Sequence, residues 1–487
     1  MIQLLIYAIS DIITGGFSFL FDGIDSITKK DNSLSSEFGN ESSLLSSRHG
    51  GLSVTGTKFL SVEKSKEHLL YFGPTGLGKS TVCLVPSALN IALSKNGIDA
   101  SMIINDPSKE NLKLMNFFIS KGYKVYRFDP NDIEHSIYYN PLHRIQNASD
   151  IAKVATLLVT KSSKETKDYW QLKSIEVISL LIGFLLEHTS KVYQNIANVY
   201  YLLENLAGNE DAVSGLFAEK STEKQWRQFK ALISNSDNTK ASIISSAIGN
   251  LSFIGNDPNL CNLTSVDTFD FSNMAKEKIV LFLNCGTAEM EYYSPLLGLF
   301  FEQLFTELFR SIPKASDNHL YLLIDELSSI PIPSLSKVIS NARKYFSILG
   351  ILQSENQLYQ SYGEYNAKTI LNNACRVYMT GLNDECERIS KALGEYEYYA
   401  DKEKKMLRTR PLMSSSEIRT MPKDRVIVIP NGGLLPLYCK VKPFYKVGKY
   451  MRYLNTKLLE EDTPSLTANY LAQYLPLDAY QQNKNES

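Results

Sequence analysis

Cysteine and histidine are scarce in this sequence, and neither type is clustered. The chain has six cysteines and six histidines among 487 residues. No two cysteines form a CxxC pair; they stand at Cys83, Cys261, Cys285, Cys375, Cys386 and Cys439. This distribution favours a reduced, cytosolic interior over a disulfide framework or a zinc site. It also offers no metal cluster of the His/Cys type.

An excess of charge of either sign is also missing. The chain carries 51 basic and 52 acidic residues, for a net charge of -1. This balance argues against a broad basic surface that wraps nucleic acid. It does not exclude a local basic loop or a basic channel lining. No stripe of basic and aromatic residues stands out. The segment 284–293, NCGTAEMEYY, follows a predicted strand and could face a pore, but it is acidic.

Long apolar runs are absent except at the N-terminus. The run Leu4 to Phe21 approaches the roughly 20 residues of a spanning helix, but Asp11 near its middle costs about 2.5–3.5 kcal/mol in a membrane. No basic region precedes the run and no A-x-A site follows it, which argues against a cleaved signal peptide. Three interpretations remain: an interfacial or partner-packing helix, a poor single span with the basic pair 29–30 on the cytoplasmic side, or a helix docked on the protein's own core.

Short apolar runs recur after a Ser-, Asn- and Glu-rich linker at 31–47. Each run is continuous rather than alternating, and each ends in polar or turn residues. The runs are 68–73, 101–107, 123–130, 278–285, 320–326, 346–354, 376–381 and 425–431. Continuous apolar runs are typical of strands buried on both faces. With the helical stretches Pro295–Arg310 and Ser334–Arg343 between them, they predict an α/β fold with a mostly parallel sheet.

One interval, from about Asp150 to Asn262, contains no predicted strand. Its patterns are helical and long enough for a small core of their own, so we expect an all-α domain inserted into the α/β domain. The predicted organisation is an N-terminal apolar helix (1–27), a Ser-rich linker (28–50), a nucleotide-binding domain in two pieces (51–149 and 263–445), the all-α domain (150–262) and a polar, solvated C-terminal tail (446–487).

The stretch Tyr71 to Val82, YFGPTGLGKSTV, fits the phosphate-binding pattern G-x-x-x-x-G-K-[ST]. An apolar strand precedes it and a helix-compatible segment follows, as that pattern requires. Backbone N–H groups and the helix N-terminus would face the phosphates of ATP, Lys79 would neutralise the β- and γ-phosphates, and Ser80 would ligate Mg²⁺. The predicted nucleotide-binding residues are Gly73, Thr75, Gly76, Gly78, Lys79, Ser80 and Thr81.

Two adjacent acids end the predicted strand LYLLIDE. Asp325 would hold Mg²⁺ together with Ser80, and Glu326 would act as general base toward the attacking water. The plainer alternative is a solvated acidic strand end. The long separation of Asp325 from Lys79 argues against a compact nucleotide kinase. The sequence has no LSGGQ-like signature, which argues against an ABC transporter ATPase. It has no NKxD-type guanine-binding motif, which argues against a guanine-nucleotide switch.

Two further residues are candidates for catalysis. Gln353 ends the predicted strand FSILGILQS, where it could sense the γ-phosphate or orient water, because ligands gather at the carboxyl ends of parallel strands. Arg343 ends the preceding helix and could project into a neighbouring subunit as an arginine finger. The plainer alternatives are a polar residue that closes a strand and a cation favoured by a helix C-terminus.

Six blocks in series resemble the type IV coupling proteins of bacterial conjugation, the TraG/TraD-like group. They are GPTGLGKSTVCLVPSAL, SMIINDPSKE, YKVYRFDP with YYNPL, LLIDELSSIP, ILQSENQLYQSYG and RPLMSSSEIRTMP. The resemblance covers roughly residues 50 to 445. A helical insert between the third and fourth blocks adds to its specificity, since the nucleotide-binding motifs alone occur in many ATPases.

The resemblance implies a RecA-like P-loop domain of the FtsK/HerA type, an all-α domain and a homo-hexameric ring around DNA. By position, Lys79 and Ser80 match the Walker A residues, Asp325 and Glu326 the Walker B acids, Gln353 the third motif and Arg343 the trans-acting arginine. The family's DPKGE-like block stands here as DPSKE, with the Lys and the Gly altered. A role of Asp106 or Glu110 near the nucleotide therefore rests on an altered motif.

The implied function is an ATP-hydrolysing DNA translocase that recruits relaxase–DNA complexes (the relaxosome) and delivers them to a type IV secretion channel. Its place would be the cytoplasmic face of the bacterial inner membrane, or the cytoplasm. The family usually has two firm membrane spans, and this chain has one weak apolar run. A nucleotide-gated docking receptor for protein substrates and a DNA pump outside conjugation are the alternatives.

Overall fold

The computed structural model describes residues 35–94, 99–160, 168–399, 407–454 and 470–480. Within these residues the chain forms two compact units, a small one comprising 382–421 with the stretch up to Gly39, and a large one comprising the rest. The sequence alone predicted one nucleotide-binding domain made of 51–149 and 263–445, whereas the structure sets 382–421 apart from it. The predicted N-terminal helix, 1–27, lies outside the described residues.

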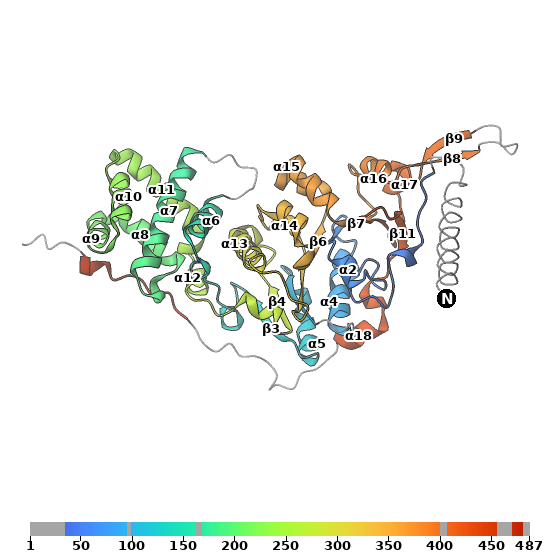
Figure 1. The fold of residues 1–487 in the computed structure, drawn as a ribbon, viewed down its shortest axis with the longest axis horizontal. Coiled ribbons are helices and arrows are strands. Elements are labelled where there is room, and N and C mark those ends of the chain that lie inside the picture. The colour runs from blue at the N-terminus through green and yellow to red at the C-terminus, as the bar shows by residue number, and fades with distance from the viewer. Residues whose placement is uncertain (1–34, 95–98, 161–167, 400–406, 455–469, 481–487) are drawn as a thin grey trace, which may run out of the picture. The chain divides into compact units, whose positions relative to one another are not determined.

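A nine-stranded sheet organises the large unit (Figure 1). Its strand order is β11-β10-β7-β1-β6-β5-β2-β4-β3. The seven strands from β7 to β3 run parallel, while β10 pairs antiparallel with both β7 and β11. The strands are β1 (Leu69–Phe72), β2 (Ala100–Asn105), β3 (Lys124–Phe128), β4 (Ile279–Leu283), β5 (His319–Ile324), β6 (Phe346–Leu352), β7 (Cys375–Met379), β10 (Arg425–Ile429) and β11 (Leu437–Lys440).

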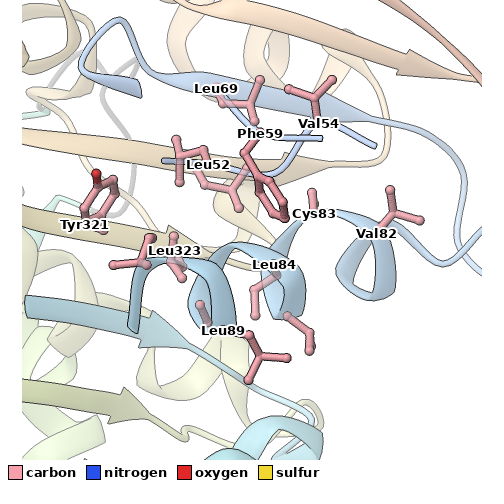
Figure 2. Close-up of a cluster of buried hydrophobic side chains, with 14 of the residues drawn as sticks. Leu52, Val54, Phe59, Leu69, Val82, Cys83, Leu84, Leu89, Tyr321 and Leu323 are labelled. Carbon is pink, nitrogen blue, oxygen red and sulfur yellow. The ribbon is translucent and has the colours of Figure 1, made fainter. Parts of the chain in front are cut away.

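The central strands are buried on both faces, which explains their continuous apolar sequences. Every residue of β1, β2, β4 and β6 is buried. Figure 2 shows part of the core on one face, where Leu84 and Leu89 of helix α4 lie with Tyr321 and Leu323 of β5. Alternate side chains of each strand face opposite sides, so a strand with helices on both sides is apolar at most of its positions.

Helices of the large unit outside the all-α domain flank this sheet. They are α2 (Val62–Ser65), α3 (Lys79–Val82), α4 (Leu84–Leu93), α5 (Met115–Ser120), α13 (Met290–Leu308), α14 (Leu335–Asn341), α15 (Glu355–Asn372) and α18 (Gly448–Leu454). The small unit contains the hairpin β8 (Glu395–Tyr399) and β9 (Leu407–Pro411) with α16 (Cys386–Leu393) and α17 (Ser415–Arg419).

The predicted fold class is confirmed: all eight predicted strands form and belong to one mostly parallel sheet. Three strands escaped prediction. The hairpin sequences EYEYY and LRTRP are rich in charged and polar residues, and LYCK of β11 is only four residues long. None of the three carries the continuous apolar signal of a strand buried on both faces.

The interval predicted to be helical forms a bundle of seven helices (Figure 1). They are α6 (Ala148–Val159), α7 (Tyr169–His188), α8 (Ile196–Gly208), α9 (Glu210–Lys220), α10 (Glu223–Ile233), α11 (Asp237–Gly255) and α12 (Pro258–Leu263). Asp168 and Gln171 form a capping box that fixes the start of α7. By length and composition α7 is the one described helix able to cross a membrane. Here it packs against α6, α8, α10 and α11 inside the bundle.

The predicted solvated tail after Lys446 needs a correction. Helix α18 buries Tyr450, and residues 470–480 lie against the all-α domain with Leu475 and Leu477 buried. The composition of the tail is polar, but a segment this short needs only two apolar side chains and a few backbone hydrogen bonds to dock.

Histidine burial gives the fold a testable pH dependence. His68 precedes β1, is fully buried, and its Nδ1 accepts a hydrogen bond from the Ile348 N–H at 3.1 Å. Burial disfavours the charged form and lowers the pKa of His68 from its usual 6.5 to about 4. Between these two pH values the unfolded chain binds a proton that the folded protein does not, so stability falls as the pH falls through this window.

We expect the variant His68→Asn to lose less stability on acidification than the parent chain. Asparagine keeps an acceptor for Ile348 and tolerates the positive φ of 61° at this position. Between pH 7 and pH 5 the parent should lose about 2 kcal/mol more unfolding free energy than the variant. Urea unfolding at both pH values measures this, with His135→Gln, at an exposed ring, as the control. Equal losses in parent and variant would exclude the buried-histidine contribution.

Candidate nucleotide-binding site

The glycine-rich loop connects β1 to α3 at the carboxyl edge of the sheet. Gly76 and Gly78 have φ values of 83° and 76°, a conformation that other residues rarely adopt. A side chain at Gly78 would place its Cβ 2.7 Å from Thr81 Oγ1. Thr81 Oγ1 in turn donates a hydrogen bond to the Gly78 carbonyl at 2.7 Å. Gly78 and Thr81 therefore fix the turn from which the helix starts, while Thr75 and Gly76 at the tip are exposed.

Lys79 lies inside this loop. It is only 9% exposed, and its Nζ donates hydrogen bonds to the carbonyl oxygens of Gly73, at 2.6 Å, and Pro74, at 3.1 Å. Burial lowers the pKa of Lys79, and the nearby carboxylates Glu326 and Asp325 oppose that shift. A half-desolvated ammonium with two carboxylates beside it is a cation suited to phosphate oxygens.

Ser80 and Asp325 meet although they are far apart in sequence. The Ser80 Oγ donates a hydrogen bond to Asp325 Oδ2 at 2.7 Å. The sheet brings them together, because β6 pairs with both β1 and β5 and the three parallel strands end at the same edge. Burial raises the pKa of the Asp325 carboxyl, and the Ser80 hydrogen bond opposes that shift.

The donor set at this edge suits Mg²⁺ bound with a nucleotide. Mg²⁺ prefers oxygen ligands and commonly takes one or two protein groups, with waters and phosphates completing the shell. Asp325 and Ser80 supply two such oxygens. No group of three or more His, Cys, Asp or Glu side chains that could cage a metal occurs in the described part of the chain. The residues present therefore fit Mg²⁺ brought in with phosphate groups rather than an all-protein metal cage.

Glu326 has an unusual backbone conformation, with φ 55° and ψ 53°. A non-glycine residue in the left-handed region costs about 1–3 kcal/mol and often marks a functional position. Its Oε1 faces Gln353, whose Nε2 donates a long hydrogen bond of 3.4 Å. Gln353 follows β6, and its own N–H donates to Gln357 Oε1 at 2.8 Å, which fixes the start of α15. The structure thus brings Lys79, Ser80, Asp325, Glu326 and Gln353 to one edge.

Arg343 lies at the opposite edge of the sheet. It belongs to a 3-10 turn, Ala342–Lys344, directly before β6, whereas Gln353 follows that strand. The strand has seven residues and therefore spans about 20 Å. Arg343 is exposed, and its charge acts on His68, at the start of β1. It is out of reach of Glu326 in its own subunit.

Two polar residues near the site were missed by the sequence reasoning. Asn105 ends β2, is fully buried, and its Nδ2 donates to the Asp325 carbonyl at 2.7 Å. Gln357 holds the backbone of Gln353. A polar residue at the end of the apolar run SMIIN was the available signal for Asn105, but it was passed over for the adjacent Asp106.

Asp106 is engaged by its own turn. Its carboxylate accepts hydrogen bonds from the Asn111 N–H and Nδ2, both at 2.9 Å, and from Ser108 Oγ at 3.2 Å. Its negative charge adds to the raised pKa of Asp325. Glu110 lies in the 3-10 helix that follows. The contacts of Asp106 give it a structural task, and no contact of Asp106 or Glu110 extends the nucleotide site.

Comparison with known proteins places the chain among conjugation proteins. The family model described as type IV secretory system conjugative DNA transfer matches residues 24–467. VirD4 of Rhizobium radiobacter is 24% identical over 346 residues, which cover 68% of this chain and 49% of VirD4. VirD4 of Agrobacterium fabrum is 23% identical over the same length. The chain spans about half the length of the curated relatives it matches.

Solved structures of the conjugative coupling protein TrwB share the fold. The unbound TrwBdeltaN70 structure aligns with a TM-score of 0.67 and 20% identity, covering 84% of this chain and 93% of that one. A TrwB complex with ADP and Mg²⁺ aligns with a TM-score of 0.66 and 19% identity, covering 84% and 94%. The mostly parallel sheet with an inserted helical domain is therefore the architecture of TrwB.

Proposed function

Because the chain belongs to the type IV secretory system conjugative DNA transfer family, we propose that it is an ATP-hydrolysing coupling protein that moves DNA toward a type IV secretion channel. The observation that carries the proposal is the meeting of Ser80, Asp325, Glu326 and Gln353 at the loop that holds Lys79. This set contains a phosphate cradle, oxygens for a metal and a base beside them. The TrwB complexes with ADP and Mg²⁺ and with a non-hydrolysable ATP analogue support ATP as the nucleotide.

Each residue has a separate task in the proposed hydrolysis. Lys79 would leave the carbonyls of Gly73 and Pro74 to bind the phosphates. Ser80 and Asp325 would hold Mg²⁺, which would neutralise charge on the phosphates. Glu326 accepts the proton of the attacking water, which Gln353 orients through its amide. The hydrogen bonds of Gln353 with Glu326 and with Gln357 connect the proposed base to the start of α15.

Arg343 completes the site of a neighbouring subunit in this proposal. Its exposure at the far edge of the sheet supports a role in trans, because no rearrangement of its own side chain spans β6. A homo-hexameric ring with DNA through its centre would place such an edge against the next nucleotide site. The proposed partners are DNA, a relaxase with its relaxosome, and channel components at the cytoplasmic face of the inner membrane.

ATP turnover with and without DNA tests this function. We expect the purified chain to hydrolyse ATP above the level of Lys79→Ala, and added single- or double-stranded DNA to raise the rate severalfold. Lys79→Ala removes the phosphate cation but leaves a small side chain that fits the helix, so its fold should be retained. Turnover equal to that of Lys79→Ala under every condition would contradict the motor.

A further inference from the structure

The C-terminal segment 470–480 occupies a groove on the all-α domain. Its residues 470–476 have no regular secondary structure, and a 3-10 turn, Leu477–Tyr480, follows. Four hydrogen bonds from side chains hold its backbone, three from the all-α domain and one from Tyr138, which precedes that domain. The Tyr470 N–H donates to Tyr138 Oη at 3.4 Å, and the Ala472 N–H donates to Asn262 Oδ1 at 2.9 Å. Asn198 supplies the other two contacts.

Asn198 holds both a donor and an acceptor of the segment. Its Nδ2 donates to the Gln473 carbonyl at 2.7 Å, and its Oδ1 accepts from the Leu475 N–H at 3.0 Å. The side chain is fully buried and is held in place by Asn195, whose Oδ1 accepts from Asn198 Nδ2 at 3.1 Å. Apart from this segment and Asn195, a buried amide here would have no partner for its polar atoms, which is costly.

Two leucines anchor the segment. Leu475 and Leu477 are 6% and 2% exposed, whereas Leu471 is 72% exposed. The segment reads YLAQYLPL from 470 to 477 and carries no charge before Asp478. The contact is thus built from backbone groups, from Leu475 and Leu477, which are separated by one residue, and from ring contacts of Tyr470 with Tyr138 and of Tyr474 with Tyr201.

Helix α9 leaves room for the end of the segment. A Cβ at Gly215 would lie 2.4 Å from the Tyr480 carbonyl oxygen, so only glycine permits this approach. Glycine in a helix interior costs about 1 kcal/mol relative to alanine. Lys220 of the same helix lies over the Tyr480 ring, 5.1 Å from its centroid. The domain therefore gives up helix stability at the position that admits this chain.

We propose that this groove is a binding site for an extended, uncharged peptide segment of a partner protein, and that residues 470–480 occupy it as an intramolecular competitor. Backbone hydrogen bonds give affinity to many sequences, and side-chain pockets select among them. The partner segment would present two leucine-like side chains one residue apart, as Leu475 and Leu477 do. The identification of the partner as a protein delivered to the channel rests on the proposed function. The existence of the groove and of its intramolecular competitor does not depend on that function.

Binding of a labelled peptide, YLAQYLPLDAY, to the full chain tests the proposal. We expect saturable binding to the double variant Leu475→Ser with Leu477→Ser, whose own segment is released, and binding at least tenfold weaker to the parent chain. Leu471→Ser, a change at an exposed leucine of the same segment, should bind the peptide as the parent does. Equal affinity in all three chains, or no saturable binding to the released double variant at any concentration, would overturn the competitor.

A variant in helix α9 distinguishes specific binding of the peptide in the groove from nonspecific binding of the peptide elsewhere on the chain. Gly215→Ala, added to the released chain, should weaken the peptide at least tenfold, because its methyl group meets the peptide backbone. Gly249→Ala in α11, where a Cβ has open space, is the matched control and should change nothing. Unchanged affinity in Gly215→Ala would overturn the site. If the chain fails to bind the peptide and the parent self-associates with increasing concentration, the groove would instead bind a second copy of the chain.

ATP turnover of the same variants distinguishes this inference from the motor. The released chain and Gly215→Ala should keep the parent's turnover, because the groove lies on the all-α domain and shares no residue with the nucleotide site. Failure of peptide binding with turnover intact would reject the groove alone. Absent turnover with peptide binding intact would reject the motor alone.

Discussion

Replacing Glu326 by glutamine is expected to lower ATP turnover by about 10²–10⁴-fold, the usual contribution of a general base. Glutamine keeps the size of the side chain and an oxygen that can accept the hydrogen bond from Gln353 Nε2. It cannot accept a proton from water. Nucleotide binding should persist, because Lys79, Ser80 and Asp325 are unchanged. Steady-state turnover and nucleotide affinity, measured on the same preparation, separate these two expectations.

The control for this variant is Glu364→Gln. Glu364 is an exposed acid of α15 that pairs with Lys368 one helical turn away, so its loss should leave turnover unchanged. Conjugative transfer in cells adds a second readout, since a docking receptor that does not pump DNA would still transfer with glutamine at 326. Turnover within twofold of the parent would remove Glu326 from the role of base.

Removing Arg343 is expected to lower turnover by about 10³–10⁵-fold, the range of arginine fingers. The substitution Arg343→Ala should leave nucleotide affinity intact, because Arg343 lies beyond β6 from its own loop. Lys344→Ala is a matched control: Lys344 is the next residue of the same turn and equally exposed. If ATP turnover falls strongly in Arg343→Ala and stays unchanged in Lys344→Ala, turnover depends on the side chain at position 343 and not on the local positive charge.

Mixing two inactive variants tests the action in trans. Subunits with Arg343→Ala keep an intact nucleotide edge, and subunits with Glu326→Gln keep an intact finger. Where a Glu326→Gln subunit presents its Arg343 to an Arg343→Ala subunit, the shared site is complete. We therefore expect turnover to reappear on mixing, with a maximum at intermediate ratios. No recovery at any ratio would leave Arg343 with a structural role only, such as its effect on the start of β1.

The sheet could be predicted because its strands are buried on both faces. In such strands most positions are apolar, so the sequence marks the strand directly. The hairpin β8–β9 has a polar sequence and the edge strand β11 has only four residues, so neither gave a strand signal. The separation of 382–421 from the nucleotide-binding domain was equally unmarked, since no linker composition stands at either boundary.

The meeting of these polar residues at one edge was predictable at the ends of strands and unpredictable elsewhere. Lys79, Asp325, Glu326 and Gln353 each follow an apolar run, and parallel strands bring such positions together. Asn105 followed the same rule but was hidden by the adjacent Asp106. The docking of residues 470–480 could not be predicted, because Asn198 and Asn262 bind backbone groups of the segment. Asparagines in a helical bundle give no sequence signal for a bound segment.

The most direct test of the account is ATP turnover per subunit as a function of chain concentration at saturating DNA. If each site needs an arginine from its neighbour, the specific rate rises steeply with concentration as the ring assembles and then reaches a plateau. The plateau falls when DNA is removed. A specific rate that is constant with concentration and indifferent to DNA would contradict an oligomeric DNA motor, whatever its absolute value.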